Sequence, residues 1–427
     1  MGFTLEGKSK SPQVEHKEKI MKFLFLLAMK NLFRYTKRTL ITASAIAFGI
    51  ILTLFVDGIL RWADDNSIQN LLNFETASLR IESQEYFNEA EYLPLKKTLP
   101  HGEAIKTLLQ KEGVDYAEET RFLSTVVNPE TGESYNFVGI GIEPSKMKKV
   151  YRFQEHIVSG AFLNKKPNSI FISSYLSKLL NRKVGDEIVI EANTVNDMHN
   201  ADSFVISGIF DSPNPAVDKK NYYISFESAN RLLDMENKFT ALSIHTPHIS
   251  RTFKKLKKLI SFDDVLVLRW QDLAKDYSTL SETKKGSTKS LLFFVFILAA
   301  VGIINTMLMA IFERKQEIGM LRSLGMQKKE ITYTFIFESA GIGFIGSLFG
   351  VIFGTAVNGI FAAVGIDYGP ILGDMDYGYR VPAVFHTQIN LNTIIVVFVF
   401  GILISVLISL YPALKASSLN IVDSLRE

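Results

Sequence analysis

Four long apolar runs constrain this chain more than any other feature of its sequence. They occupy residues 39–60, 288–312, 331–364 and 391–412. A helix of about 20 apolar residues can cross a hydrocarbon layer of about 30 Å, so the pattern predicts a membrane protein with four transmembrane helices. The third run is longer than one crossing needs, so its helix must tilt, break or extend beyond the bilayer. We expect Tyr411 and Pro412 to close the fourth run.

Basic residues beside these runs predict the orientation, because Lys and Arg in short flanks stay on the cytoplasmic side. Nine Lys and Arg residues precede Thr39, whereas residues 365–390 contain only Arg380. The connection between the second and third runs is also basic. We therefore expect three segments in the cytoplasm, residues 1–38, 313–330 and 413–427, and two outside, residues 61–287 and 365–390.

The N-terminal flank favours a retained helix over a cleaved signal peptide, because the first apolar run begins only at Thr39 and is too long. Met21 is a possible natural start. Phe23, Leu27 and Leu32 alternate with basic residues such as Lys30, which predicts a short amphipathic helix at the inner membrane surface. A solvated basic flank is the alternative.

Residues 61–287 have the pattern of a water-soluble α+β domain inserted between the first and second membrane helices. Strand-like runs occur at residues 203–210, 221–225 and 265–268. Helical patterns occur at residues 102–112, 174–180, 225–234 and 251–259. The chain has no cysteine, which excludes disulfides, and its net charge of +3 gives no reason to expect nucleic acid as a partner.

Signatures of catalysis are missing from the sequence. No Gly-x-x-x-x-Gly-Lys-[Ser/Thr] loop is present to bind ATP phosphates. Gly341, Gly343 and Gly346 form a Gly-x-Gly-x-x-Gly string, but it lies inside an apolar run and is a false match to a nucleotide site. His245 and His248 are too few ligands for zinc. We expect no catalytic residue, no metal and no directly bound cofactor.

Polar and small residues inside the apolar runs are candidates for function, each with a structural alternative. Asp57 could mark a substrate entrance at the outer end of the first run, or it could cap or snorkel at a helix end. Glu338 would be costly in lipid, and helix packing or partial protonation would explain it. Gly346, Gly350 and Gly354 form a small-residue ridge that favours close helix packing.

The segment that follows the second apolar run carries the strongest motif, Glu-Arg-Lys-Gln-Glu-Ile-Gly-Met-Leu-Arg-Ser-Leu-Gly at residues 313–325. Ile318, Leu321 and Leu324 are spaced for one face of an amphipathic helix, and Gly325 is placed to end it. The run resembles the signature of FtsX-like ABC transporter permeases, in which a short cytoplasmic helix docks into the ATPase. A solvated charged connector is the alternative.

Other stretches carry the same resemblance. Residues 31–42 resemble the family's approach to its first span, and residues 411–426 resemble its closing motif, except that Asn420 and Ile421 stand where the family often has Asp-Pro. Weaker similarity to the family's periplasmic core lies at residues 158–160, 183–186 and 204–210.

The resemblance implies a permease subunit in a bacterial inner membrane, with the large domain in the periplasm. ATP and Mg would be bound by a LolD-like ATPase dimer, and a second permease, a paralogue or another copy, would complete the transporter. The residues implied in coupling to the ATPase are Glu313, Arg314, Glu317, Ile318, Gly319, Leu321, Arg322, Leu324 and Gly325.

Within the family, the size of the outer domain and a turn at residues 56–58 favour a LolC/LolE-like role in releasing lipoproteins from the membrane. The alternatives are MacB-like efflux of peptides or drugs, an FtsX-like regulator of periplasmic hydrolases, and a peptide sensor, which would require ten spans. Acyl chains would enter a pocket lined by Ile46, Ile50, Phe55, Asp57, Phe294, Ile297 and Val301.

A loop with Asp211, Pro213 and Pro215 could meet a soluble LolA-like acceptor of the released lipoprotein. The alternative for this loop is an ordinary hairpin connection between the strands that flank it.

Overall fold

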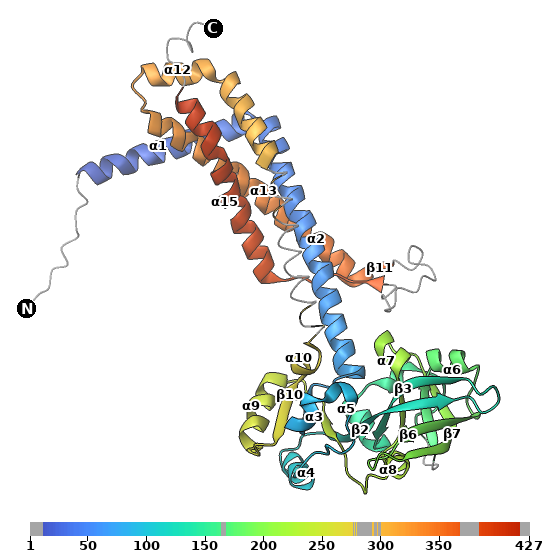
Figure 1. The fold of residues 1–427 in the computed structure, drawn as a ribbon. Coiled ribbons are helices and arrows are strands. Elements are labelled where there is room, and N and C mark those ends of the chain that lie inside the picture. Colours follow the sequence, from blue (N-terminus) through green and yellow to red (C-terminus); the bar gives the residue numbers. More distant parts are fainter. Residues whose placement is uncertain are drawn as a thin grey trace, which may run out of the picture. The chain divides into compact units, whose positions relative to one another are not determined.

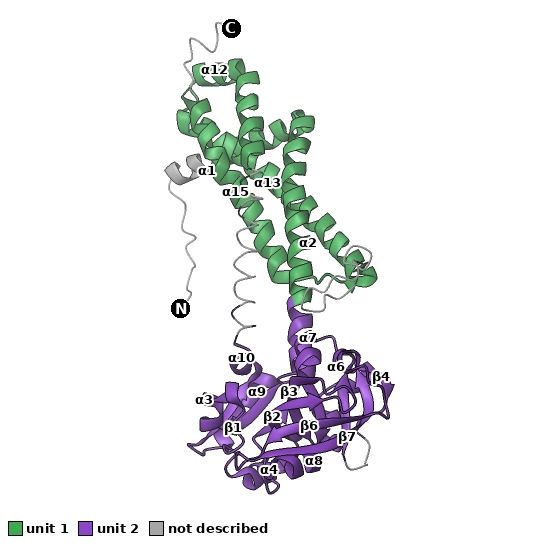
Figure 2. Cartoon of the chain, turned by 45° about the vertical axis from the view of Figure 1, so that its right-hand side comes forward, with its two compact units in different colours: residues 1–63, 283–368, 384–427 green, residues 64–282, 369–383 purple. Residues whose placement is uncertain are grey.

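A computed structural model provides the structure of the chain. It describes residues 12–163, 168–275, 277, 279, 293, 297, 300–367 and 384–418, with side chains from residue 18 onward. The chain divides into two compact units (Figure 2). Unit 1 comprises Met1–Ala63, Thr283–Tyr368 and Val384–Glu427, and unit 2 comprises Asp64–Glu282 and Gly369–Ala383.

Unit 1 is built from helices, labelled in Figure 1. They are α1 (Pro12–Arg34), α2 (Thr36–Phe74, which continues into unit 2), α12 (Lys315–Ser323), α13 (Lys328–Val364) and α15 (Leu391–Ser417). A short ladder of β11 (Ile366–Asp367) and β12 (Val384–Phe385) is also present.

Among the described residues, three helices are long and apolar enough to cross a membrane: α2, α13 and α15. A shorter apolar helix at Ala300–Glu313 falls in the predicted second span, most of whose earlier residues lie outside the described residues. Three of the four predicted spans are thus present as candidate membrane-spanning helices, and the fourth stays a prediction.

The structure contradicts two expectations about the long apolar helices: a possible break in the third run and the end of the fourth. α13 is one unbroken helix of 37 residues, about 55 Å long, so the option of a break is wrong. The predicted closure of the fourth run at Tyr411 and Pro412 is also wrong, because α15 continues through Pro412 to Ser417. A proline removes one backbone hydrogen bond, and burial of Ala413 and Ala416 beyond it holds the last turns in the unit 1 core.

The predicted ridge of small residues on α13 is confirmed as a packing surface for α2. A Cβ atom on Gly346 would lie 2.9 Å from the Cβ of Ile46, and one on Gly350 would lie 2.8 Å from the Cβ of Ile50. Real Cβ atoms do not approach this closely, so only glycine permits this spacing of the two helices. A Cβ atom on Gly354 would lie 2.9 Å from Cδ1 of Leu54 and 3.2 Å from Cα of Ile51.

Unit 2 is an α+β domain, as expected. Its strands are β1 (Leu79–Ser83), β2 (Tyr116–Val127), β3 (Ser134–Ile142), β4 (Ile157–Gly160), β5 (Ser169–Ser173), β6 (Glu187–Asn193), β7 (His199–Phe210), β8 (Asn221–Ser225), β9 (Ala241–Ile244) and β10 (Val265–Arg269). Its helices are α3 (Gln84–Asn88), α4 (Gly102–Lys111), α5 (Pro144–Val150), α6 (Ser174–Leu180), α7 (Pro215–Lys220), α8 (Phe226–Leu233), α9 (Ile249–Leu259) and α10 (Trp270–Leu273). All seven predicted strands and helices are present, with ends within two residues except at the start of β7.

The ten described strands of unit 2 form one sheet that closes on itself in part. β2, β3, β8, β5, β7 and β6 pair in this order, and β6 pairs again with β2. The long strand β2 makes closure possible, because its first residues pair with β9 and its last pair with both β3 and β6. Phe122, Phe204 and Tyr222 fill the interior of the closed part.

The open part of the sheet has its own core. β10, β1 and β9 extend from β2, with α4 and α9 supplying the apolar residues that cover them. Ile105, Leu109 and Leu256 are the buried positions of these two helices, and they pack with Ile81 and Leu242 from the strands.

Candidate functional site

The predicted coupling helix forms as α12, between the Ala300–Glu313 helix and α13. Gly325 has φ +101°, which favours glycine, and the prediction that it ends the helix is confirmed. The amide of Gly325 donates to the carbonyl of Arg322, and the amide of Met326 donates to that of Leu321, the two bonds of a Schellman cap. This cap turns the chain sharply into α13.

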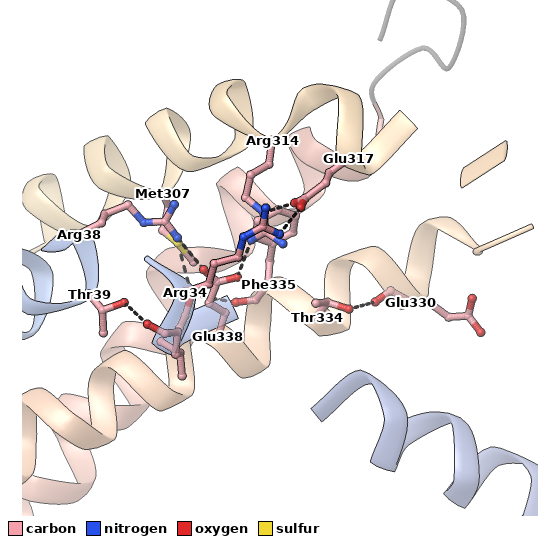
Figure 3. A network of polar contacts seen from close by, with 12 residues as sticks. Arg34, Arg38, Thr39, Met307, Arg314, Glu317, Glu330, Thr334, Phe335 and Glu338 are labelled. Carbon is pink, nitrogen blue, oxygen red and sulfur yellow. Dashed lines mark hydrogen bonds and ion pairs between the residues drawn. The ribbon is translucent and has the colours of Figure 1, made fainter. Parts of the chain in front are cut away.

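Two arginines converge on the buried carboxylate of Glu338 beside α12, as Figure 3 shows. Arg38 of α2 donates from Nη2 to Oε1 at 2.6 Å, and Arg314 donates from Nη1 to Oε2 at 3.1 Å. Arg314 also donates from Nε to Oε2 of Glu317 at 2.9 Å. Both oxygens of Glu338 are therefore paired with a positive charge, and α2, α13 and the start of α12 are joined.

Tyr35, the single residue between α1 and α2, lies among these arginines. The guanidinium carbons of Arg34, Arg38 and Arg314 lie 5.5, 5.4 and 5.6 Å from the centre of its ring. The face of an aromatic ring attracts cations, so Tyr35 offsets part of the repulsion among three like charges. The junction of α1 and α2 is thereby fixed to α12.

Glu317 extends this network from α12 to α1. Arg34, the last residue of α1, donates from Nη1 to Oε1 of Glu317 at 2.7 Å. Burial acts to raise the pKa of Glu317, but the hydrogen bond and charge of Arg314, with the charge of Arg34, outweigh it and lower the pKa below its ordinary value. Glu317 is therefore a carboxylate at neutral pH.

The other charged residues of the motif differ in their surroundings. Arg322 donates from Nη1 to the backbone carbonyl of Ser417 at 3.1 Å, which ties α12 to the end of α15. Glu313 is exposed. Thus Arg314, Glu317 and Arg322 are engaged within unit 1, and Glu313 is open to solvent.

The prediction that Ile318, Leu321 and Leu324 share one face is wrong. Ile318 is buried in the unit 1 core, Leu321 is half-buried, and Leu324 is 79% exposed. Leu324 follows Ile318 by six residues, which at 3.6 residues per turn places it on a different side of the helix. Leu324 is also the C-cap and no longer part of the regular helix. The apolar surface that α12 exposes is instead formed by Met320 and Leu324, and Gly319 is buried behind it.

Sequence reasoning found Glu338 as a charge inside an apolar run but missed its partners. Arg38 is 300 residues away in the chain, and Arg314 was interpreted only as part of the motif. One signal could have joined them, since Arg38 directly precedes the first run, Arg314 follows the second and Glu338 lies two turns into the third, all near one predicted membrane face. The two arginines that pair with Glu338 join α13 to α2 and α12, in agreement with the helix-packing alternative.

Asp57 lies inside α2, which continues to Phe74, so the option of a helix cap is wrong. Arg61, one turn later, donates from Nε to its Oδ2 at 2.8 Å and from Nη2 to the hydroxyl of Thr393 at 3.1 Å. Asp57 thus holds an arginine that bridges α2 and α15.

The residues of the predicted acyl pocket are not joined by the described contacts. Ile46 and Ile50 are buried against the glycines of α13, and the ring of Phe55 packs edge-on against Phe361 at 5.5 Å. Ile297 and Val301 are exposed by 43% and 53%. Phe294 lies outside the described residues, so the pocket as a whole stays a prediction.

The segment with Asp211, Pro213 and Pro215 is not a hairpin connection, so that alternative is wrong. β7 and β8 do not pair with each other, and α7 separates them, with Pro215 at its first turn. The hydroxyl of Ser212 donates to Oδ1 of the buried Asp218 at 2.6 Å, which fixes the loop. Contact with an acceptor protein stays a prediction.

Unit 2 contains a second buried charge cluster, on β1 and β2. Arg121 donates from Nε to Oε2 of Glu119 at 3.2 Å and from Nη2 to the backbone carbonyl of Glu75 at 2.8 Å, just beyond the end of α2. Arg80 reaches the same carbonyl at 3.4 Å. Neither oxygen of the nearby Glu82 has a hydrogen-bond partner among the described residues.

The carboxylates of this cluster have opposite pKa shifts. Burial raises the pKa of Glu82 above its ordinary 4.5. Burial acts in the same direction on Glu119, but the charges of Arg121 and Arg80 outweigh it and lower the pKa. The hydroxyl of Tyr151 donates to Oε1 of Glu119 at 2.5 Å, and burial raises the pKa of that tyrosine to about 12.

Two family models match the chain. A model described as FtsX-like permease C-terminal matches residues 289–421, which include all of α12, α13 and α15. A model described as MacB-like periplasmic core domain matches residues 39–257, a little more than half of the 427 residues.

Three curated proteins that are similar to this chain are named for different functions or for none. An uncharacterized ABC transporter permease of Methanocaldococcus jannaschii, MJ1507, is 26% identical over 66% of this chain and 69% of its own. The lipoprotein-releasing system transmembrane protein LolC of Xylella fastidiosa is 23% identical over 67% of this chain and 72% of its own. The macrolide export ATP-binding/permease protein MacB of Bdellovibrio bacteriovorus is 26% identical over 38% of this chain and 22% of its own.

Proposed function

The chain belongs to the FtsX-like family of ABC transporter permeases with a MacB-like periplasmic core domain, and we propose that it extracts lipoproteins from the membrane. Such a permease implies an ATPase partner, which would hydrolyse ATP with bound Mg. The similarity to LolC covers 72% of that protein, whereas the similarity to MacB covers 22% of MacB. This wider coverage supports lipoprotein release over efflux, although the percentage identities do not separate the two.

The observation that carries the coupling part of the proposal is the arrangement of α12. Its exposed side chains, Met320 and Leu324, offer an apolar surface to a partner, while Arg314 and Ile318 on its inner side are buried. Arg314 is paired with Glu338 of α13, which is paired in turn with Arg38 of α2. An ATPase that pushes on α12 would therefore move α2 and α13 with it.

α2 supplies a path for this motion toward the outer domain. It is one helix from Thr36 to Phe74, and Arg121 and Arg80 hold the carbonyl of Glu75 directly after its end. A shift of α2 along its axis would thus be passed to β1 and β2, which carry these arginines. The protein would convert motion, and hydrolysis would occur in the partner.

Extraction of an acylated lipoprotein would need the energy of ATP, because its acyl chains are stabilised in the membrane. Each buried methylene gains about 0.8 kcal/mol from an apolar environment, so a lipoprotein leaves the membrane only with an energy source and an apolar site to receive it. The predicted pocket on the first and second spans would be that site, together with a second permease. The loop with Asp211, Pro213 and Pro215 would meet a LolA-like acceptor.

A charge on the exposed side of α12 tests the coupling. Leu324→Asp should reduce ATP hydrolysis by the assembled transporter at least tenfold, because the aspartate would be buried against the ATPase without a partner. Leu324 is 79% exposed, so the variant should fold normally. Tyr92→Asp, at a residue of unit 2 that is 73% exposed, is the matched control. Normal hydrolysis by Leu324→Asp would reject α12 as the docking helix.

Depletion of the protein in its host tests the cargo. Outer-membrane lipoproteins should remain in the inner membrane, measured by fractionation, while sensitivity to drugs stays unchanged. Normal sorting with drug or peptide hypersensitivity would establish MacB-like efflux instead. Normal sorting with a cell-wall or division defect would establish the FtsX-like regulator.

A further inference from the structure

α1 has two apolar faces, and the structure shows what covers the first. Leu24, Ala28 and Leu32 recur at every fourth residue and are 1%, 0% and 3% exposed. They pack α1 onto α13, where a Cβ atom on Gly341 would lie 2.4 Å from Cδ1 of Leu32. The helix predicted from Phe23, Leu27 and Leu32 is present, but only Leu32 of these belongs to the docked face, and the predicted place at the membrane surface stays a prediction.

The second face is exposed although it is rich in large apolar side chains. Phe23, Leu26 and Phe33 are 58%, 57% and 75% exposed. Together with Lys30 they follow the spacing i, i+3, i+7 and i+10, which places all four on one stripe of the helix, opposite the docked face. Lys22, also exposed, borders this stripe.

The chemistry of this stripe identifies its partner. Aromatic and leucine side chains that alternate with lysine suit a lipid surface, because the rings enter the acyl boundary while the lysine ammonium groups stay at the phosphates. The exposed positive charges complement anionic headgroups. α1 is packed on the membrane-spanning helix α13, and Figure 1 shows that α1 runs across the direction of α2 and α15, as a helix in the membrane surface must.

α1 is also connected to the coupling helix. Its last residue, Arg34, is ion-paired with Glu317 of α12 at 2.7 Å, and the next residue, Tyr35, contacts Arg314. A force that holds α1 at the lipid surface is therefore transmitted to α12 through two side chains. The position of α12 would depend on what α1 binds.

We propose that the Phe23, Leu26, Lys30 and Phe33 stripe of α1 binds anionic phospholipid and that Arg34 and Glu317 pass this contact to α12. Anionic lipid would thereby raise the rate at which the permease stimulates its ATPase. This second step rests on the proposed coupling role of α12, whereas the lipid contact does not.

The lipid contact can be measured on the full chain, which contains no native cysteine. Leu26→Cys is labelled with a polarity-sensitive dye in nanodiscs that contain brominated phosphatidylcholine, alone or mixed with phosphatidylglycerol. We expect lipid quenching at this site, at least twofold stronger with phosphatidylglycerol. Tyr92→Cys in unit 2 is the control and should not be quenched. The proposal would be overturned by equal quenching in both lipids or by no quenching. It would also be overturned if the dye were shielded from solvent only after the ATPase is added.

Charge reversal separates lipid binding from coupling. Lys22→Glu with Lys30→Glu should abolish the extra quenching by phosphatidylglycerol, whereas Lys254→Glu with Lys258→Glu on α9, at two exposed lysines, should not. Arg34→Ala should keep the quenching but lose the stimulation of ATP hydrolysis by phosphatidylglycerol. If Arg34→Ala keeps that stimulation, the proposed link to α12 is wrong. If Leu324→Asp also leaves hydrolysis normal, the coupling role of α12 itself fails, while the quenching result still stands.

Discussion

Glu338 in α13 and Glu82 in β1 are both buried acidic side chains, 0% and 1% exposed. Glu338 receives a hydrogen bond from an arginine on each oxygen, whereas neither oxygen of Glu82 has a hydrogen-bond partner among the described residues. The difference shows two ways to bury a carboxyl group. In the helical unit two arginines pair with the buried carboxyl group and join helices, whereas in the sheet burial raises the pKa of Glu82.

Glu338→Ala should have the largest effect, because it would remove the buried counter-charge of Arg38 and leave Arg314 paired with Glu317 alone. Removal of one partner from a buried ion pair costs about 3–5 kcal/mol. Thermal unfolding of the detergent-purified chain measures the loss. Glu313→Ala removes an exposed glutamate of the same region and should melt as the unaltered chain does. Equal melting of both variants would mean that the buried ion pairs do not hold the helices together.

Glu119→Gln should have a smaller effect, about 1.5–3 kcal/mol, because the amide can still accept from Tyr151 but loses its charge against Arg121. The pKa of Glu119 is lowered in the fold, so its stabilising contribution is present above pH 4.5 and is lost as pH falls through the folded pKa. Hydrogen exchange of β2 at several pH values measures this dependence. Glu187→Gln, at an exposed position of β6, should show none of it.

Glu82→Gln should stabilise unit 2 at alkaline pH, in contrast to both variants above. The pKa of Glu82 is raised in the fold, so its contribution is full below pH 4.5 and is lost as pH rises through the folded pKa. The neutral amide avoids that loss, which is worth about 1.4 kcal/mol for each unit of pKa shift. Hydrogen exchange of β1 should therefore be slower in the variant at pH 8 and unchanged at pH 4. Faster exchange at pH 8 would show that Glu82 is a paired carboxylate like Glu338.

Glu317→Gln should change stability least, by less than about 1 kcal/mol, because its pair with Arg34 is open to solvent and the amide oxygen can still accept from Nε of Arg314. Stimulated ATP hydrolysis should nevertheless fall, since this pair connects α1 to α12. Melting and hydrolysis are measured on the same preparation. A stability loss as large as that of Glu338→Ala would mean that Glu317 stabilises the fold as Glu338 does. Its effect on ATP hydrolysis could then not be assigned to coupling between α1 and α12.

Helix and strand boundaries that are set by residues close in the chain were predicted well. The helix at Ser174–Leu180 and the strand at Asn221–Ser225 have the predicted bounds, because a capping serine and a short run of β-forming residues are local signals. Gly325 ends α12 as expected for the same reason. Pro412 misled the prediction of the end of α15, since burial of the next turns outweighs the single hydrogen bond that a proline removes.

The sequence by itself determined the apolar helices, the α+β domain and the motif of α12, because apolar period and turn residues act over short stretches of chain. Tertiary structure alone decided the rest. It brought Arg38 to Glu338 across 300 residues, closed the sheet through the pairing of β6 with β2, and left Leu324 rather than Ile318 exposed on α12. These outcomes depend on which distant elements pack together, and a carboxylate 0% exposed must find its partners wherever the fold places them.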